Sequence, residues 1–87
     1  MVKLPYGDTQ RSAVYTVREA AAVVRELREA TGLTQQELAS RANVSRSFVA
    51  DVEAGKPSVE ASKLFDVFNA LGHEIAVRNS ETGEFRR

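Results

Sequence analysis

The stretch from residue 34 to residue 53 most constrains the fold of this chain, because it contains two helix starts only a short distance apart. Thr34 is followed three residues later by Glu37, the spacing of a capping box, and a short helical pattern follows. Ser45 begins a second pattern. Asn43, which tolerates left-handed backbone angles, lies between the two. The sequence therefore predicts two short helices joined by a tight turn.

Small and branched apolar residues occupy the predicted crossing of these helices. Ala39 and Ala42 allow the helices to approach closely, and Val44 and Val49 fill the angle between them. Two helices joined in this way form a helix-turn-helix unit. Such a unit places its second helix in the major groove of DNA, with the first residues of that helix at the base edges. The pattern predicts a DNA-binding surface at the start of the second helix.

Further helices are predicted on both sides of this unit. Thr16 and Glu19 repeat the capping-box spacing ahead of an amphipathic helix that ends before Gly32. Residues 60–71 form a wide apolar face that includes Phe65, which predicts a last helix. The charged residues of the first helix are predicted to lie on its polar faces: Arg18, Arg25, Glu26, Arg28 and Glu29.

The period changes from helical to alternating after the last predicted helix. In residues 73–79, Ile75 and Val77 point to one face, which predicts a short β-strand with one buried side. A lone strand leaves its backbone groups without partners, so this one needs a second strand. Residues 13–17 and the same segment of a second subunit are the two candidates. Dimerisation would also enlarge the modest core of so short a chain.

These patterns divide the chain into four parts. Residues 1–15 are predicted to be a flexible arm, and residues 16–72 a helix-turn-helix domain. Residues 73–79 are the predicted dimerisation strand, and residues 80–87 a polar, disordered tail.

The residues at the start of the predicted second helix have side chains suited to DNA. Arg46 can donate two hydrogen bonds to a guanine edge, and Ser45 and Ser47 are short donors and acceptors. Ala50 permits close approach to a thymine methyl group. Asp51 either accepts a hydrogen bond from a cytosine amino group or repels phosphate.

Three further residues are candidates for phosphate contacts, and Arg41 is the weakest of them. Gln35 lies in the first turn of the preceding helix, where free backbone amides also face an anion. Lys56 follows the second helix and carries a positive charge. Phe48, between the base-contacting candidates, is predicted to pack inside.

The composition restricts the other functions open to the chain. Its 12 basic residues balance 12 acidic ones, so DNA affinity has to come from local placement of charge. The absence of cysteine excludes disulfides and thiolate metal sites. His73 has no nearby nucleophile and no metal-ligand spacing, and we expect neither an enzyme nor a metal or cofactor. Without a membrane-spanning apolar run or a signal peptide, we expect a cytoplasmic protein with no membrane partner.

The stretch LTQQELASRANVSRSFVADVEAGKPSVEASKLFDVFNALG resembles the Xre/Cro-type helix-turn-helix domain, and the resemblance covers about residues 17–72. The short strand directly after it is similar to that of HipB-type antitoxins. The resemblance implies an all-α, lambda-repressor-like bundle of four to five helices. It also implies one short C-terminal β-strand that pairs across a homodimer, with His73, Ile75 and Val77 at the interface.

The same resemblance implies a function and roles for individual residues. It implies a repressor that binds an inverted-repeat operator, represses its own operon, and binds and restrains a HipA-type kinase toxin. Gln35 matches the phosphate-binding glutamine of the family, and Ser45, Arg46 and Ser47 match its DNA-contacting positions. Asp51 departs from the neutral or basic groups that the family has there, which leaves its role open.

Two other functions are compatible with the residues. One is a stand-alone Xre-type transcriptional regulator with no toxin partner. The other is a protein-binding adaptor that keeps the fold without binding DNA, which the neutral net charge and Asp51 favour.

Overall fold

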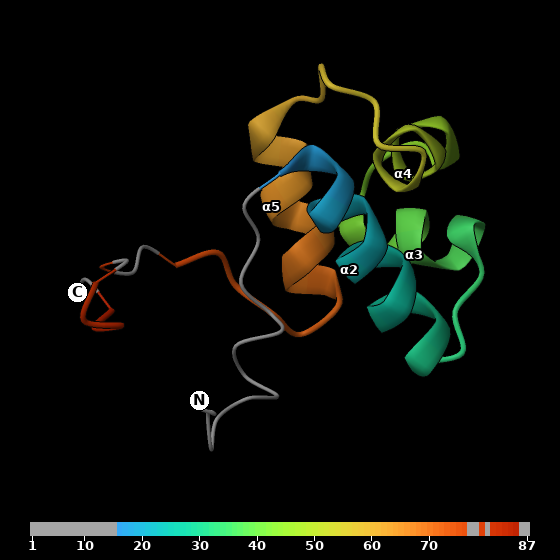
Figure 1. Ribbon diagram of the computed structural model, residues 1–87. Helices are drawn as coiled ribbons and strands as arrows, with labels where there is room; N and C mark the ends of the chain where they lie inside the picture. The colour runs from blue at the N-terminus through green and yellow to red at the C-terminus, as the bar shows by residue number, and fades with distance from the viewer. Residues whose placement is uncertain (1–15, 77–78, 80, 86–87) are drawn as a thin grey trace.

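The structure is a computed structural model that describes residues 16–76, 79 and 81–85. This part of the chain forms four helices, α2 (Val17–Ala30), α3 (Gln35–Ala42), α4 (Arg46–Glu53) and α5 (Ala61–Ala70). In Figure 1 α5 lies to the left and α3 and α4 to the right, with α2 in front; α3 packs against both α4 and α5, and α2 packs against α4. The prediction of an all-α bundle of four to five helices is confirmed for the described residues.

Side-chain caps define where three of the helices begin. The Thr16 hydroxyl accepts a hydrogen bond from the Glu19 amide, and the Ser45 hydroxyl accepts one from the Phe48 amide. At the start of α3 the capping box is complete in both directions: the Glu37 amide donates to the Thr34 side chain, and the Thr34 amide donates to the Glu37 carboxylate. The capping pattern in the sequence therefore placed these helix starts correctly.

The turn between α3 and α4 depends on one left-handed residue. Asn43 ends α3 with a φ of 59°, as its residue type predicts. The Val44 amide then donates to the carbonyl of Ala39, which satisfies a backbone group that the end of α3 leaves free. The chain can thus reverse within three residues and start α4 at Ser45.

The core lies where the four helices meet. Val24, Leu38, Val49 and Val67 are fully buried, and each comes from a different helix. Ala39 and Ala42 are also buried, which confirms that small residues occupy the crossing. Further core members close the space around them: Ala21, Val52, Phe68 and Leu71. Burial of this apolar surface is the main source of stability for so small a bundle.

One expectation about apolar residues needs correction, and a second is not tested by the single chain. Phe65 was expected on the buried face of the last helix, but it is 49% exposed, because the buried face is centred on Val67, Phe68 and Leu71 and leaves Phe65 at its edge. The predicted strand is absent over His73–Ala76, which has no regular secondary structure in the single chain. A strand requires hydrogen bonds to a neighbour. Of the candidate neighbour, residues 13–17, Thr16 caps α2 and Val17 begins it, and residues 13–15 lie outside the described residues.

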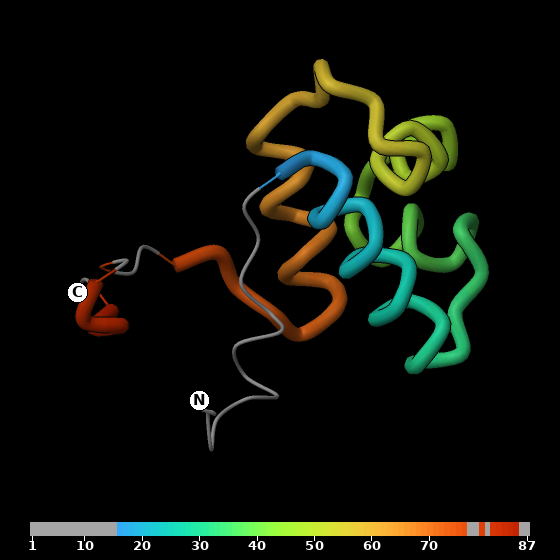
Figure 2. The backbone as a smooth tube through the Cα atoms, in the orientation of Figure 1, coloured from blue at the N-terminus to red at the C-terminus, as the bar shows by residue number. Residues whose placement is uncertain are grey.

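The part of the chain after α5 runs away from the helices, as the backbone trace in Figure 2 shows. Val77 and Arg78 lie outside the described residues, as do residues 1–15, 80 and 86–87. Near the end, the Asn79 amide donates to the Glu84 carbonyl over 2.8 Å and closes a short turn. Disorder of the tail and flexibility of the arm remain predictions. None of the helices in the described part has the length and hydrophobicity needed to cross a bilayer.

Candidate nucleic-acid interface

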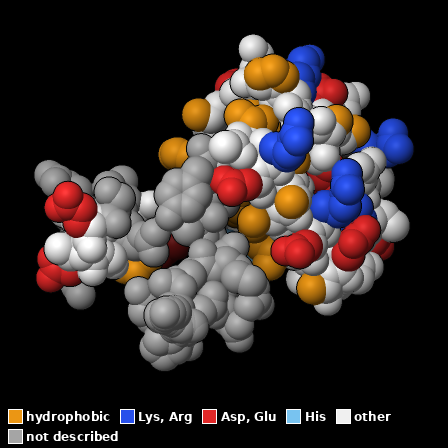
Figure 3. Space-filling view, in the orientation of Figure 1, with side chains coloured by type: hydrophobic (Ala, Val, Ile, Leu, Met, Phe, Trp, Pro, Cys, Tyr) orange, Lys and Arg blue, Asp and Glu red, His pale blue; other side chains and the backbone are white. Residues whose placement is uncertain are grey.

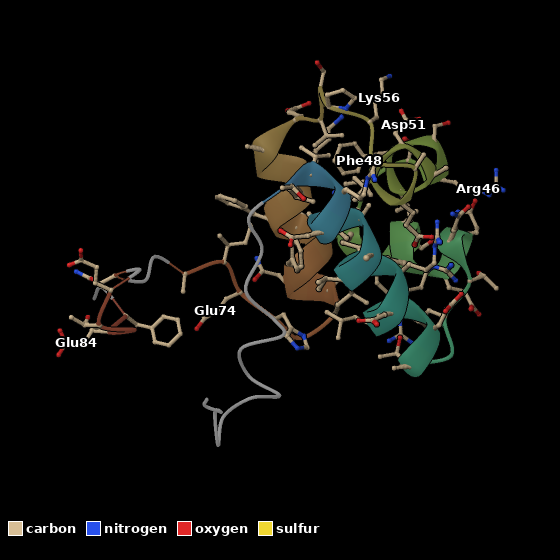
Figure 4. All side chains as sticks on the ribbon, in the orientation of Figure 1. Arg46, Phe48, Asp51, Lys56, Glu74 and Glu84 are labelled. Carbon is tan, nitrogen blue, oxygen red and sulfur yellow. The ribbon has the colours of Figure 1, made fainter. Side chains whose placement is uncertain are left out.

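The start of α4 lies at the surface of the bundle. Ser45, Arg46 and Ser47 are exposed, and Ala50 and Asp51 are half-buried. Figure 4 shows the Arg46 side chain extending outward from the start of α4. The residues predicted to contact bases are therefore accessible along the first turns of α4, and α3 packs against this helix.

Ser45 has a structural role as well as an accessible side chain. Its hydroxyl oxygen accepts the Phe48 amide proton over 3.0 Å, so the hydroxyl proton is still free to donate to a phosphate or base. Phe48, predicted to pack inside, lies against the core as a partly buried residue.

Arg46 occupies an electrostatically unfavourable position. It is the first residue of α4, where the helix dipole places partial positive charge. Among the described residues it has no hydrogen bond or ion pair, and the first turn of α4 contains no acidic residue to balance it. A cation in this position is stabilised when an external anion or a guanine edge approaches it.

A buried carboxylate, Glu53, joins α2, α3 and the end of α4. Arg28 Nε donates to Glu53 Oε2 over 2.6 Å, and Arg28 Nη2 donates to Oε1 over 3.1 Å. Gln35 Nε2 donates to the same Oε1 over 3.1 Å, and Arg25 Nη2 donates to the Glu53 carbonyl over 3.2 Å. The Glu53 side chain is only 3% exposed. This network holds the first turn of α3, which contains Gln35, at a fixed position relative to α4.

The ionised form of Glu53 is favoured in the folded protein. Burial acts to raise the pKa of Glu53, but the hydrogen bonds from Arg28 and Gln35, together with the charges of Arg28 and Arg25, lower it. The net result is a pKa below the ordinary glutamate value, so the carboxylate stays charged at neutral pH.

The sequence did not reveal this network. Arg28 was assigned to a polar face, yet its side chain is only 14% exposed and is covered by contacts with Glu53. The two residues are 25 positions apart, and no periodicity in either helix links them. The only hint was that Gln35 and the end of α4 both belong to the predicted helix-turn-helix unit.

Gln35 and Lys56, the predicted phosphate contacts, both have partners within the protein. Gln35 is half-buried and uses one side-chain proton for Glu53, which leaves a second proton for a phosphate. Lys56 Nζ lies 3.6 Å from Asp51 Oδ2, and both side chains are about half exposed. Figure 4 shows Lys56 and Asp51 close together, on the side of α4 away from Arg46.

Basic side chains visible in Figure 3 gather mainly over the half of the molecule formed by α2, α3 and α4. Acidic side chains lie among them, so the charge is mixed rather than uniformly positive. This agrees with the formal net charge of zero. Contacts at specific positions must therefore provide most of the attraction to an anionic partner.

The predicted dimer residues lie apart from this surface. His73 is exposed, with its Nδ1 2.9 Å from the Leu71 carbonyl, and Ile75 is 50% exposed. Val77 lies outside the described residues. The described residues include no cluster of three or more His, Cys, Asp or Glu side chains able to hold a metal ion.

Solved structures with the same fold include a chain of a HipA–HipB complex and a gene regulator. A chain in the structure of a HipA–HipB–O2–O3 complex superposes with a TM-score of 0.74 at 17% identity, covering 80% of this chain and 99% of that one. The clp gene regulator ClgR of Corynebacterium glutamicum gives a TM-score of 0.59 at 34% identity, covering 69% of this chain and 65% of that one. These similarities confirm the predicted lambda-repressor-like helix-turn-helix fold.

Sequence comparison gives the same family. The chain is 38% identical over 64 residues to y4mF, an uncharacterized HTH-type transcriptional regulator of Sinorhizobium fredii (strain NBRC 101917 / NGR234), covering 74% of this chain and 84% of that protein. It is 38% identical over 60 residues to the immunity repressor protein of Bacillus phage phi105, covering 68% of this chain and 42% of that protein. Residues 19–79 match the family described as "Helix-turn-helix domain". The chain thus belongs to the family of DNA-binding helix-turn-helix transcriptional regulators, which confirms the expectation that it is not an enzyme.

Proposed function

We propose that this chain is a dimeric repressor that binds an inverted-repeat operator through the exposed start of α4. The single observation that carries the proposal is Arg46, which is exposed and unpaired among the described residues at the positive end of its helix. The fold stabilises neither the charge nor the position of this side chain. A guanine edge offers two acceptors at a spacing that suits the guanidinium group.

The remaining candidate residues have complementary roles in this proposal. Ser45 and Ser47 donate to a phosphate or a neighbouring base, and Ala50 lets the helix approach the groove. Gln35 and the first amides of α3 bind a phosphate, while Glu53 holds the Gln35 side chain in place. The phosphate contacts position the protein, and the α4 contacts select the sequence.

The experiment for operator binding is a fluorescence anisotropy titration with duplexes from the region upstream of the gene. We expect tighter binding to a duplex that contains an inverted repeat, with half-site centres about 34 Å apart, than to a scrambled duplex of equal length. The ratio of the two affinities should persist as salt is raised, although both affinities fall. Equal affinity for both duplexes at every salt concentration would rule out sequence-specific repression.

The proposed dimer forms through residues 73–79, whose strands pair across a two-fold axis with His73, Ile75 and Val77 at the interface. The half-exposed Ile75 supports this proposal, as does the backbone of residues 74–76, which makes no hydrogen bond to another described residue, because pairing would cover both. Light scattering coupled to gel filtration should show a dimer for the wild type. Val77→Asp should give a monomer, since it places a charge on the buried face, whereas Ala76→Asp on the opposite face should remain dimeric.

The more specific proposal is that the protein is the HipB-type antitoxin of a toxin–antitoxin operon and restrains a HipA-type kinase toxin. It is supported by the family resemblance of residues 17–72 together with the fold shared with a chain from the HipA–HipB complex. Co-expression with the product of the adjacent gene tests it. Co-purification of a kinase-like product whose activity falls on binding would support the antitoxin. A neighbour that neither binds nor resembles a kinase would favour the alternative, a stand-alone Xre-type regulator, which the similarity to y4mF supports.

A further inference from the structure

We propose that Asp51 determines base specificity by accepting a hydrogen bond from the N4 amino group of a cytosine. Lys56 is a positioning residue in this proposal, because its positive charge offsets the repulsion between the Asp51 carboxylate and the DNA backbone. The proposal rests on the proposed function, because it assigns one base of the operator to one side chain of α4.

Asp51 lies on the same face of α4 as Ser47, one of the proposed DNA contacts. It follows Ser47 by four residues, and residues four apart in a helix are neighbours on one face. Its side chain is 47% exposed, so the carboxylate is accessible although the residue belongs to the recognition helix. The distance along the helix places it one turn beyond Ser47, within reach of the next base.

A free carboxylate on this face would repel the DNA backbone, and the fold supplies a counter-charge. The Gly55 amide donates to the Val52 carbonyl over 3.0 Å, and the Lys56 amide donates to the Asp51 carbonyl over 3.0 Å. With Gly55 at a φ of 77°, this is a Schellman motif that ends α4. The motif brings Lys56 close to Asp51, and Lys56 Nζ lies 3.6 Å from Asp51 Oδ2. The end of the helix thus builds the ion pair from local backbone geometry.

The chemistry of the pair favours cytosine over the other bases. An ionised carboxylate only accepts hydrogen bonds, so the acceptors of guanine and the O4 of thymine repel it. Adenine presents its N7 acceptor beside its amino group, whereas cytosine presents the N4 amino group alone. Because Lys56 engages Oδ2, Oδ1 is the oxygen left for one donor, and one donor is what cytosine offers.

This assignment predicts how two side chains depend on each other. If Lys56 acts through Asp51, removing the Lys56 side chain leaves the Asp51 carboxylate without its counter-charge. The affinity then changes according to the base pair that Asp51 contacts. If Lys56 instead contacts a phosphate directly, its removal weakens binding to every sequence equally, whatever occupies position 51. The two possibilities differ in base preference and not only in affinity.

The experiment selects high-affinity duplexes from a random library with the full chain, and repeats the selection with Asp51→Asn. The wild type should select cytosine at one position of each half-site. The variant should select adenine there, because asparagine donates and accepts in the pattern that adenine matches. We expect the preference for cytosine over adenine, measured by titration of the two duplexes, to change by about tenfold or more.

A double-mutant cycle tests the role of Lys56. Lys56→Met should weaken binding to the selected duplex in the wild type and have a smaller effect in the Asp51→Asn background. Lys63→Met is the matched control, since Lys63 lies 3.5 Å from Glu60 in a similarly exposed ion pair at the start of α5, with its Nζ 6.0 Å from the Phe48 ring of α4 and not beside Asp51. Its effect should be the same in both backgrounds, and circular dichroism melting confirms that each variant folds.

The outcomes separate this inference from the function on which it rests. A wild type that selects no sequence contradicts the proposed function. A wild type that selects a motif, with Asp51→Asn selecting the identical motif, contradicts only the role of Asp51. Equal effects of Lys56→Met in the two backgrounds contradict the role of Lys56 and return it to a phosphate contact.

Discussion

Helices α3 and α4 have the same length of eight residues and the same kind of N-cap, but their charges are arranged in opposite directions. In α3 the acid Glu37 lies in the first turn and the base Arg41 in the last. In α4 the base Arg46 comes first and the acid Glu53 comes last. The helix dipole favours the arrangement in α3 and opposes that in α4 at both ends. Stability therefore explains the charges of α3, while those of α4 require another explanation.

The two ends of α4 differ in how the unfavourable charge is balanced. Arg28, Arg25 and Gln35 surround Glu53 and satisfy its carboxylate. Among the described residues nothing comparable surrounds Arg46. A disfavoured charge at a helix end that has partners within the protein contributes to the structure. A disfavoured charge without such partners indicates a surface that binds a ligand. Substitutions at Glu53 and at Arg46 should therefore have different effects on folding and on DNA binding.

Glu53→Ala should cause the largest change. It leaves Arg28 largely buried without its partner, and removing one member of a buried ion pair costs about 3–5 kcal/mol in the free energy of unfolding. Urea denaturation followed by circular dichroism measures this. Glu29→Ala is the control, because the Glu29 side chain is 64% exposed and lies 4.0 Å from the same Arg28. A loss no greater than that of the control would show that the network is not what holds α4 in place.

Lowering the pH should remove the charge of Glu53 without removing the side chain. Because the pKa of Glu53 in the folded state lies below its ordinary value of 4.5, the stabilisation is fully present above about pH 4.5 and is lost as the pH falls through the folded pKa. The free energy of unfolding should therefore decline with falling pH in this acidic range. In Glu53→Gln the decline should be shallower, since the neutral amide has no charge to lose. An identical slope for both proteins would assign the decline to other carboxylates.

Arg46→Ala tests the uncompensated end of α4. The affinity for the operator should fall by about 1–3 kcal/mol, and discrimination at one base pair should be lost. Arg41→Ala is the control, because Arg41 is an exposed arginine at the favourable end of α3. Anisotropy titrations against single-position operator variants measure both effects. An equal loss from Arg46→Ala on all duplexes would make Arg46 a phosphate contact rather than a base contact.

The contrast between the two helices also separates what the sequence could predict from what it could not. Helix starts depend on residues three positions apart, so Thr34, Glu37 and Ser45 sufficed to place them. The left-handed Asn43 was likewise predictable from its own residue type. The exposed face of α4 followed from the same local patterns, which is why the candidate DNA contacts could be named from the sequence.

Features that depend on distant residues were not predictable in this way. The pairing of Arg28 with Glu53 spans 25 positions, and each residue taken alone has the pattern of a solvent-exposed charge. Phe65 is apolar at a helical spacing, yet it is 49% exposed because Val67, Phe68 and Leu71 form the buried face of α5 and Phe65 lies at the edge of that face. A strand that pairs across a dimer depends on a second chain altogether, so the single chain does not test it.

The N-caps of the two helices should have similar strength, despite the different charges that follow them. Thr34→Ala and Ser45→Ala should each lower the free energy of unfolding by about 1 kcal/mol, because each leaves an amide of the first turn without its acceptor. Urea denaturation of the two variants in parallel measures the difference. A much smaller effect at Ser45 would mean that α4 is held by its tertiary contacts alone, and that its cap serves DNA binding more than folding.

The smallest expected change in the free energy of unfolding comes from reversing the charge at the start of α4. Arg46→Glu gives the first turn of α4 the same sign of charge as that of α3, and a favourable charge at a helix end is worth about 0.3–1 kcal/mol at an exposed position. The free energy of unfolding should therefore rise by this amount in low salt, and the gain should shrink as salt screens the interaction. Operator binding should be lost in the same variant, since a carboxylate would face phosphates and the guanine acceptors. If the charge of Arg46 is retained for DNA binding, the Arg46→Glu variant should therefore be more stable than the wild type and should no longer bind the operator. If Arg46→Glu instead destabilised the fold, Arg46 would have a structural role in α4, and the difference between the two ends of the helix would no longer indicate function.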